Sequence, residues 1–277
     1  MPNALTHTLA ATLQQSRKAR RVSQLELSLQ MGVSQRHVSF VESGRAKPSR
    51  ELLTSWLKVL DMPLAQRNAA MLQAGYAPLY SQSALIDAPL ASAKDALMHL
   101  LHTHDPMPAF VIDAHWNLLH VNAGGRWLAQ TLMPWLASAI EKGTQLNMLD
   151  ALCHPNGFTK HLINLKEVGP IFLEHIREAA WVRTSLAPKA EAFAALLRDK
   201  LGSYSMHVNQ PCQTAPVLTS RFATGHGELS FFSMFTTFGT PQDITLASLR
   251  VEHMFATDAH TKAVLEQQVT YQNTRLC

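Results

Sequence analysis

The sequence predicts an α + α/β chain of two domains, an N-terminal bundle of five helices followed by an antiparallel sheet packed with helices. Apolar residues recur at helical spacing from Ala4 to about Ala77, in segments of roughly 8 to 15 residues separated by Gly or Pro. β-rich runs first occur after residue 107. At 277 residues, the chain is long enough for two domains of ordinary size.

Charge is distributed unevenly between these two parts. Residues 1–80 contain ten Lys or Arg and four Asp or Glu, a net charge of +6. Residues 81–277 contain fourteen and sixteen, a net charge of −2. A basic N-terminal part is typical of a domain that binds a polyanion.

Cysteine usage and hydropathy place the chain in a cellular compartment. Cys153, Cys212 and Cys277 show no Cys-x-x-Cys spacing, so they predict neither a disulfide framework nor a zinc site and fit a reducing compartment. The first residues lack a signal-peptide pattern, and no apolar run approaches the roughly 18 residues of a membrane span. We therefore expect a soluble, cytoplasmic protein with no membrane partner.

Residues 22–49 predict a pair of helices joined by a tight turn. Ser23 stands three residues before Glu26, the spacing of a capping box that begins a helix. Gly32 can adopt the positive φ of a tight helix exit, and Ser34 can cap the next helix. Apolar residues at helical spacing hold the two helices together: Leu27, Met31, Val38 and Val41.

The outward-facing residues of this pair suit contact with DNA. Arg36 can donate two hydrogen bonds to guanine, and Gln35 can pair with adenine in the same bidentate way. Gln24, Arg45 and Lys47 flank this helix and can contact phosphates. The predicted DNA-binding residues are Gln24, Ser34, Gln35, Arg36, His37, Ser39, Phe40, Arg45 and Lys47.

A helical bundle with no nucleic-acid partner would have the same apolar contacts, but the sequence pattern favours DNA. VSQLELSLQMGVSQRHVSFVESGRAKPS, residues 22–49, resembles the xenobiotic-response-element type helix-turn-helix of lambda-repressor-like regulators. The resemblance implies double-stranded operator DNA as partner, a phosphate contact for Gln24, and base-facing positions for Gln35, Arg36 and Phe40. Phe40 departs from the polar residue common there, and two roles stay open for it: contact with a thymine methyl or packing against the loop.

The second domain is predicted to be a mixed one. A linker is expected over residues 79–95, where Pro, Ser and small residues occur without a period, which leaves 1–78 and 96–277 as domains. Residues 108–123 predict a hairpin, residues 125–200 are mostly helical in pattern, and strands are expected within 216–224, 228–239 and 244–256. Five strands split by helices can close as one antiparallel sheet, with a cavity between sheet and helices.

The sequence contains none of the common catalytic or cofactor-binding motifs, so we expect no catalytic residue, no enzyme and no cofactor. The densest polar cluster is His99, His102, His104 and Asp105. These residue types suit a metal ion, but solvated histidines at a helix C-terminus are the commoner arrangement, and we predict no metal.

Aromatic residues dominate what remains of the second domain. Most of them are expected to fill its core, and a subset to line a ligand pocket. Both roles stay open for each residue. The candidates for ligand binding are Phe110, Trp116, Asn122, Trp127, Phe172, Phe222 and Phe232.

Segments across the chain resemble the MmyB-like family, in which a repressor-type helix-turn-helix precedes a ligand-binding domain of PAS-like fold. They are RNAAMLQAGYAP at 67–78, PAFVIDAHWNLLHVNAGG at 108–125, and residues 219–258. The resemblance implies a ligand-responsive regulator with a small apolar ligand, a fatty acid being the suspected one. Asp113, Trp116 and Asn122 match the family pattern D-x-x-W-x-x-x-x-x-N; either they contact the ligand or they hold the hairpin, and we favour the structural role.

The leading hypothesis is therefore a transcriptional repressor controlled by its C-terminal domain. One helix-turn-helix buries too little surface for tight specific binding, so a homodimer on two half-sites is expected. Two other classes stay open. One is a DNA-tethered enzyme acting on a lipid or hydrophobic small molecule, and the other is a protein-interaction module.

Overall fold

The computed structural model describes residues 8–136, 145–202 and 217–275. The chain divides into two compact units, residues 1–87 with 240–247 and residues 88–239 with 248–277. The first unit boundary falls inside the predicted linker, and a short segment from between two strands belongs to the first unit. Within the described residues, no helix has the length and apolar character of a membrane span.

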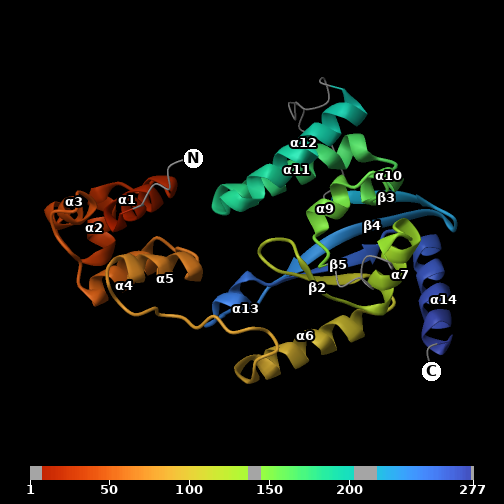
Figure 1. Ribbon diagram of the computed structural model, residues 1–277, viewed down its shortest axis with the longest axis horizontal. Helices are drawn as coiled ribbons and strands as arrows, with labels where there is room; N and C mark the ends of the chain where they lie inside the picture. The colour runs from red at the N-terminus through yellow and green to blue at the C-terminus, as the bar shows by residue number, and fades with distance from the viewer. Residues whose placement is uncertain (1–7, 137–144, 203–216, 276–277) are drawn as a thin grey trace. The chain divides into compact units, whose positions relative to one another are not determined.

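The first unit contains the five predicted helices (Figure 1). They are α1 (Leu9–Ala19), α2 (Gln24–Met31), α3 (Gln35–Glu42), α4 (Arg50–Val59) and α5 (Leu64–Gln73). The first four begin at a Ser or Thr whose hydroxyl oxygen accepts a backbone N–H of the first turn, namely Thr8, Ser23, Ser34 and Ser49. Gly32, at φ 66°, ends α2 in the left-handed conformation, so that α3 can begin three residues later.

The core of the first unit confirms the predicted contacts between α2 and α3. Leu27, Val38 and Val41 are buried together with Trp56 of α4, and Met31 is partly buried against them. Burial of these side chains supplies the main free-energy gain of the helical unit.

The second unit is a five-stranded antiparallel sheet with helices on both faces, in the strand order β2-β1-β5-β4-β3. The strands are β1 (Ala109–Ile112), β2 (Leu118–Val121), β3 (Thr219–Thr224), β4 (Gly227–Thr236) and β5 (Arg250–Ala256). The helices, in chain order, are η1 (Ala88–Leu90), α6 (Ala91–His104), α7 (Ala123–Leu132), α9 (Met148–Cys153), α10 (Phe158–His161), α11 (Leu165–Val182), η2 (Thr184–Leu186), α12 (Ala187–Leu201) and α14 (Ala259–Arg275).

The two faces of this sheet are covered differently. Phe110 and Phe231 point to the face that packs on α7, α9, α10, α11 and α12, here called the inner face. Neighbouring residues of each strand point to the outer face, where α6 packs on β1 (Figure 1). β1 is buried throughout because it is covered on both faces.

The hairpin and the predicted strands are confirmed, with one correction. Residues 244–248, expected to begin the last strand, form α13 (Ile244–Ser248), and β5 begins only at Arg250. A carboxylate oxygen of Asp243 accepts the backbone N–H of Thr245 at 2.8 Å. This local hydrogen bond favours a helical start over the β propensity of Ile244 and Thr245.

Candidate nucleic-acid interface and ligand site

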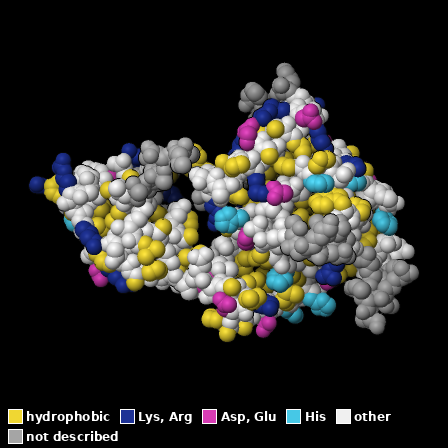
Figure 2. Space-filling model, in the orientation of Figure 1, with side chains coloured by type: hydrophobic (Ala, Val, Ile, Leu, Met, Phe, Trp, Pro, Cys, Tyr) yellow, Lys and Arg dark blue, Asp and Glu magenta, His cyan; other side chains and the backbone are white. Residues whose placement is uncertain are grey.

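The predicted DNA-binding residues lie along α3 and at its two ends. Gln35 and Arg36 are exposed on its first turn, and Arg45 and Lys47 are exposed in the segment that follows it. The others divide by exposure: Ser34 is exposed, and Gln24, His37, Ser39 and Phe40 are partly buried. Basic side chains outnumber acidic ones on the face of this unit shown in Figure 2.

Gln24 is held by a buried ion pair beneath the interface. Its amide nitrogen donates to a carboxylate oxygen of Glu42 at 2.8 Å. Arg17 donates to both oxygens of the same carboxylate, at 2.7 and 2.8 Å, and both partners are buried. These hydrogen bonds raise the pKa of Arg17. The ion pair orients Gln24, whose amide nitrogen carries a second proton for a phosphate.

Lys47 is oriented by an aromatic ring. Its ammonium group lies 5.0 Å from the centroid of the Tyr76 ring, and the Tyr76 hydroxyl donates to the carbonyl of Pro48 at 2.9 Å. Tyr76 lies just after α5, so the end of the helical unit supports the cation that follows α3.

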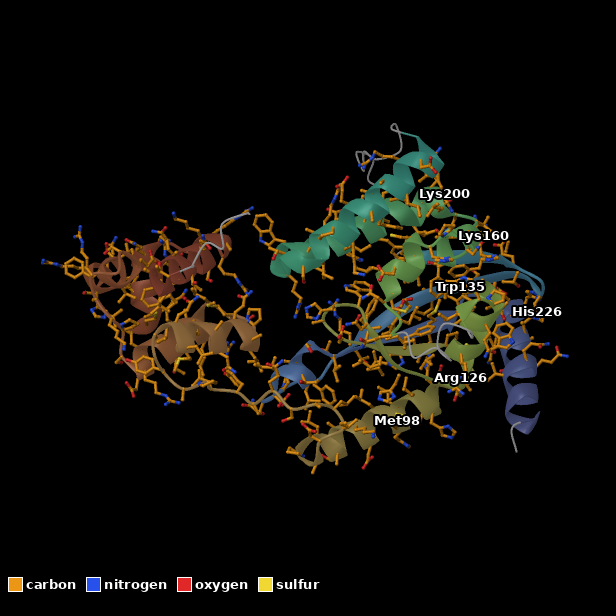
Figure 3. All side chains as sticks on the ribbon, in the orientation of Figure 1. Met98, Arg126, Trp135, Lys160, Lys200 and His226 are labelled. Atoms are coloured by element: carbon orange, nitrogen blue, oxygen red, sulfur yellow. The ribbon has the colours of Figure 1, made fainter. Side chains whose placement is uncertain are left out.

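The aromatic candidates for ligand binding occupy three different environments. Phe110, Trp127 and Phe222 are buried in the core of the second unit, and Phe172 is partly buried against that core. The Trp127 ring lies 5.4 Å from that of His226, labelled in Figure 3. Phe232 points to the outer face and stacks on Phe255 at 5.1 Å. The structure therefore does not bring Phe232 together with the other candidates.

Asn122 has a complete set of structural hydrogen bonds. Its amide oxygen accepts the N–H groups of Ala109 and Gly125, both at 2.8 Å. Its amide nitrogen donates to the carbonyls of Met107 and Leu101, at 2.7 and 3.2 Å. These four bonds join the start of α7 to β1, as expected of a residue that holds the hairpin.

Trp116, in the turn between β1 and β2, lacks such a set. Its φ of 67° is a left-handed conformation that is rare for a bulky residue and is found at functional sites. Asp113 holds the turn by accepting the N–H groups of His115 and Asn117, at 2.7 and 2.9 Å. The indole N–H of Trp116 is buried and has no hydrogen-bond partner within the described part of the chain. An unpaired buried donor of this kind suits an acceptor brought by a ligand.

A positive charge lies next to Trp116. The guanidinium carbon of Arg250, at the start of β5, lies 5.6 Å from the Trp116 ring centroid. Burial lowers the pKa of Arg250, and repulsion from Arg183, which follows α11, lowers it further. Neither arginine has an ion-pair partner among the residues that the structure describes. Two neighbouring cations without a carboxylate can accept an anion.

A partly buried carboxyl group lies on the inner face, near Arg250 in the same strand. Glu252 follows Arg250 by two residues of β5, and the Ser233 hydroxyl of β4 donates to it at 2.7 Å. Burial raises the pKa of Glu252, which the hydrogen bond from Ser233 opposes. Because burial disfavours its charged form, Glu252 is a weaker competitor for the two arginines than an ordinary carboxylate.

Two family models match this sequence, one in each part of the chain. A model of the MmyB-like transcription regulator ligand binding domain matches residues 93–267, more than half of the chain. The chain belongs to the MmyB-like transcription regulators. A helix-turn-helix model matches residues 13–66, so this family member is a ligand-modulated, DNA-binding transcription regulator.

The other comparisons add little to this assignment. No curated protein matches the sequence of the regulator. Among solved structures, 97% of it matches an RNA-binding light-oxygen-voltage receptor at 14% identity, with a TM-score of 0.24. The regulator spans 64% of that receptor's chain, and so low a TM-score carries no structural argument.

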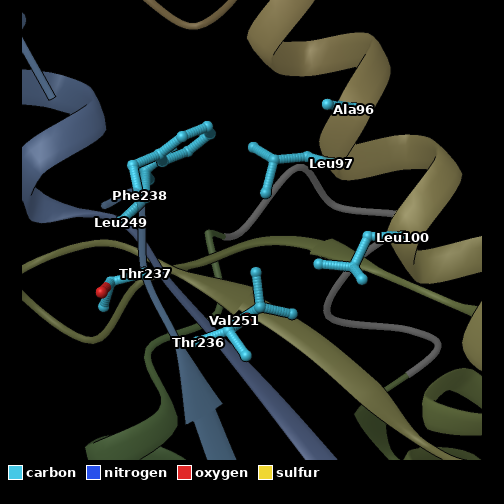
Figure 4. Close-up of a pocket in the computed structure, with 8 residues that line it drawn as sticks. All are labelled: Ala96, Leu97, Leu100, Thr236, Thr237, Phe238, Leu249 and Val251. Carbon is cyan, nitrogen blue, oxygen red and sulfur yellow. The ribbon is translucent and has the colours of Figure 1, made fainter. Parts of the chain in front are cut away.

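A pocket that the sequence did not predict lies on the outer face of the sheet, under α6 (Figure 4). Its volume is about 110 Å³, below the roughly 300 Å³ at which ligand pockets begin. The residues that line it are Ala96, Leu97, Leu100, Thr236, Thr237, Phe238, Leu249 and Val251. None of the aromatic candidates is among them.

The histidine cluster of α6 requires a second correction. His99 and His102 are exposed as expected, but His104 is partly buried. Its Nε2 lies 3.1 Å from the carbonyl oxygen of Met254, and its ring packs edge-on against His253 at 4.8 Å. His104 is not solvated because the last turn of α6 ends against β5. The described residues contain no group of three or more His, Cys, Asp or Glu suited to a metal ion.

Proposed function

We propose that this regulator is a repressor that binds operator DNA as a homodimer and is controlled by an amphipathic ligand with an anionic head group. A fatty acid is the first candidate for that ligand. The observation that carries the proposal is the site around Trp116, whose buried indole N–H is unpaired and whose ring lies 5.6 Å from the guanidinium of Arg250, which in turn is repelled by Arg183.

An anion bound at this site would explain three features of it. A carboxylate oxygen can accept the Trp116 N–H, and its charge can offset the repulsion between Arg183 and Arg250. Hydrogen bonds to charged groups contribute about 1.5–3 kcal/mol each, enough to set the orientation of an otherwise apolar ligand. The strained backbone of Trp116 is then the local cost of placing that donor.

A continuous strip of hydrogen bonds supports control of the helix-turn-helix by this site. Asn68 of α5 accepts the N–H groups of Leu79 and Tyr80 at 2.8 and 3.1 Å and donates to the Tyr80 carbonyl at 2.8 Å. Arg67 donates to the Tyr80 hydroxyl at 3.1 Å. Residues 79 and 80 are thereby attached to the last helix of the DNA-binding unit.

The next residues of the strip attach to the segment that precedes β5. Asp243 accepts the Ser81 hydroxyl at 2.6 Å and the Ser83 N–H at 3.0 Å, and the Thr245 hydroxyl donates to the Ser83 carbonyl at 2.6 Å. Arg250 follows Asp243 by only seven residues. We propose that an anion on Arg250 shifts this segment and, through it, α5.

A homodimer follows from the size of the DNA-reading surface. One helix α3 can span only one half-site, and two copies on half-sites about one helical turn apart supply the remaining contacts. We further propose that the second unit carries out no reaction. Its Ser233 hydroxyl is exposed and donates to Glu252, and the sequence around Ser233 has none of the common motifs of a catalytic serine.

The test is fluorescence anisotropy on DNA from upstream of the regulator's own gene, in a salt series with and without oleate. Oleyl alcohol is the matched control because it has the same chain and no charge. We expect salt-dependent, sequence-selective binding that oleate weakens and oleyl alcohol leaves unchanged. Equal effects of acid and alcohol would disprove the anionic head group, and absence of selective binding would disprove the regulator.

A further inference from the structure

Phe40 is the one apolar side chain among the predicted base-facing residues, and two cations lie on its ring. The guanidinium carbon of Arg36 is 5.2 Å from the ring centroid and that of Arg45 is 6.0 Å from it. Arg36 precedes Phe40 by one turn of α3, so both side chains lie on one face of the helix. Arg45 comes from outside the helix.

The chain that follows α3 is folded back onto Phe40. The Phe40 carbonyl accepts the N–H groups of Arg45 and Ala46, at 2.8 and 3.1 Å. Gly44, at φ 73°, has the left-handed conformation that turns the chain at this point. The return places Arg45 beside the ring, although Arg45 and Arg36 are nine residues apart.

Two like charges on one ring would separate in water if nothing held them. The negative face of the phenyl ring attracts each guanidinium, which restricts the rotamers of both long side chains. Ordering them before binding removes part of the entropy that each arginine would otherwise lose on DNA. The ring is itself partly buried.

We infer that Phe40 is a positioning residue for sequence recognition, one that orders Arg36 toward base edges and Arg45 toward the neighbouring phosphate. This inference rests on the proposed binding of operator DNA. It answers the two roles left open for Phe40: the ring contacts the loop through Arg45, and its effect on DNA passes through the two arginines.

The test compares Phe40→Leu, which keeps apolar volume and removes the ring, with Phe40→Tyr, which keeps the ring. Selective affinity of full-length protein for its operator and for single-base variants is measured by anisotropy, with thermal melting as the folding control. We expect Phe40→Leu to lose about tenfold in operator affinity and to blur the preference at the base that Arg36 contacts. Phe40→Tyr is expected to keep the wild-type operator affinity and the wild-type preference at that base.

A second measurement does not depend on DNA. In free wild-type protein, NMR signals of the Arg36 and Arg45 side-chain protons are expected to show upfield ring-current shifts that Phe40→Leu removes. If the wild type is selective and Phe40→Leu has the same profile, or if the ring-current shifts are absent, the inference about Phe40 is overturned and the proposed function is not. A wild-type protein without selectivity would instead refute the proposed function. Should Phe40→Leu melt early, Phe40→Met takes its place.

Discussion

The predicted DNA-binding residues of the regulator all come from residues 24–47, whereas the residues of the proposed ligand site come from four separate places in the chain. Trp116 lies in a hairpin turn, Arg183 follows α11, Ser233 is in β4, and Arg250 and Glu252 are in β5. The residues of the first region are exposed or partly buried, and their positions depend on caps and helix spacing. The second needs the completed sheet, so a change in one strand alters the whole site.

The largest effect is expected where the first region does depend on a distant partner. Glu42→Ala leaves Arg17 buried without its carboxylate and releases Gln24. Loss of one partner of a buried ion pair costs about 3–5 kcal/mol in the free energy of unfolding. Urea unfolding should show this loss, and Gln30→Ala, on an exposed site of α2, should show little. A small effect at Glu42 would mean that local caps alone maintain the region.

Arg250→Ala tests whether the second region binds an anion. It should lower oleate affinity tenfold or more, because a charge-assisted hydrogen bond of about 1.5–3 kcal/mol is lost. Operator affinity without ligand should stay unchanged. Isothermal titration with oleate measures the effect, and Arg221→Ala is the control because Arg221 is half-exposed and paired with Glu228. Undiminished oleate binding by Arg250→Ala would show that the head group of the ligand does not bind at Arg250.

Arg36→Ala tests the first region without affecting its fold. Arg36 is exposed on α3, so its loss should cost about 1–3 kcal/mol at one base position and relax the preference there. Lys47→Ala is the comparison, since loss of a phosphate contact should weaken all sequences about equally. Binding to a set of single-base operator variants distinguishes the two. A uniform loss for Arg36→Ala would remove it from the recognition surface.

The same contrast explains how much of the molecule the sequence predicts. The helix pair follows from Ser23, Gly32 and Ser34, because a cap and an exit act within a few residues. Arg183 and Arg250 carry no such local signal, because only sheet pairing and helix packing bring Arg250 to Trp116 and Arg183 near Arg250.

The face of the sheet to which a side chain points is the other feature that the sequence did not predict. Phe231 and Phe232 are equivalent as residue types, yet the strand register sends the first to the core and the second to the outer face. Likewise, α6 could end in solvent or against a strand, and the burial of His104 depends on which occurs. Family resemblance supplied what spacing could not, namely that a ligand domain follows the helix-turn-helix.

Asp243→Asn tests the connection between the two regions and has the smallest expected effect. The variant keeps the shape of the side chain but weakens the hydrogen bonds to Ser81 and Ser83, so operator and oleate affinities should change little when measured separately. The coupling between them, the ratio of operator affinities without and with oleate, should fall several-fold toward one. Asp87→Asn, on an exposed carboxylate of the same stretch, should keep the coupling.

The pH dependence of that connection has a definite sign. Burial would raise the pKa of Asp243, but the hydrogen bonds from Ser81, Ser83 and Thr245 outweigh it and lower the pKa. The stabilisation is therefore fully present above the ordinary Asp pKa of about 3.9 and is lost as pH falls through the lowered value. The coupling of the wild-type protein should therefore be constant across neutral pH. The unfolding free energy of Asp243→Asn should lack the acid-dependent part that the wild type shows. Coupling that survives in Asp243→Asn would show that the signal reaches α3 by another route, with the strip serving only to attach the linker.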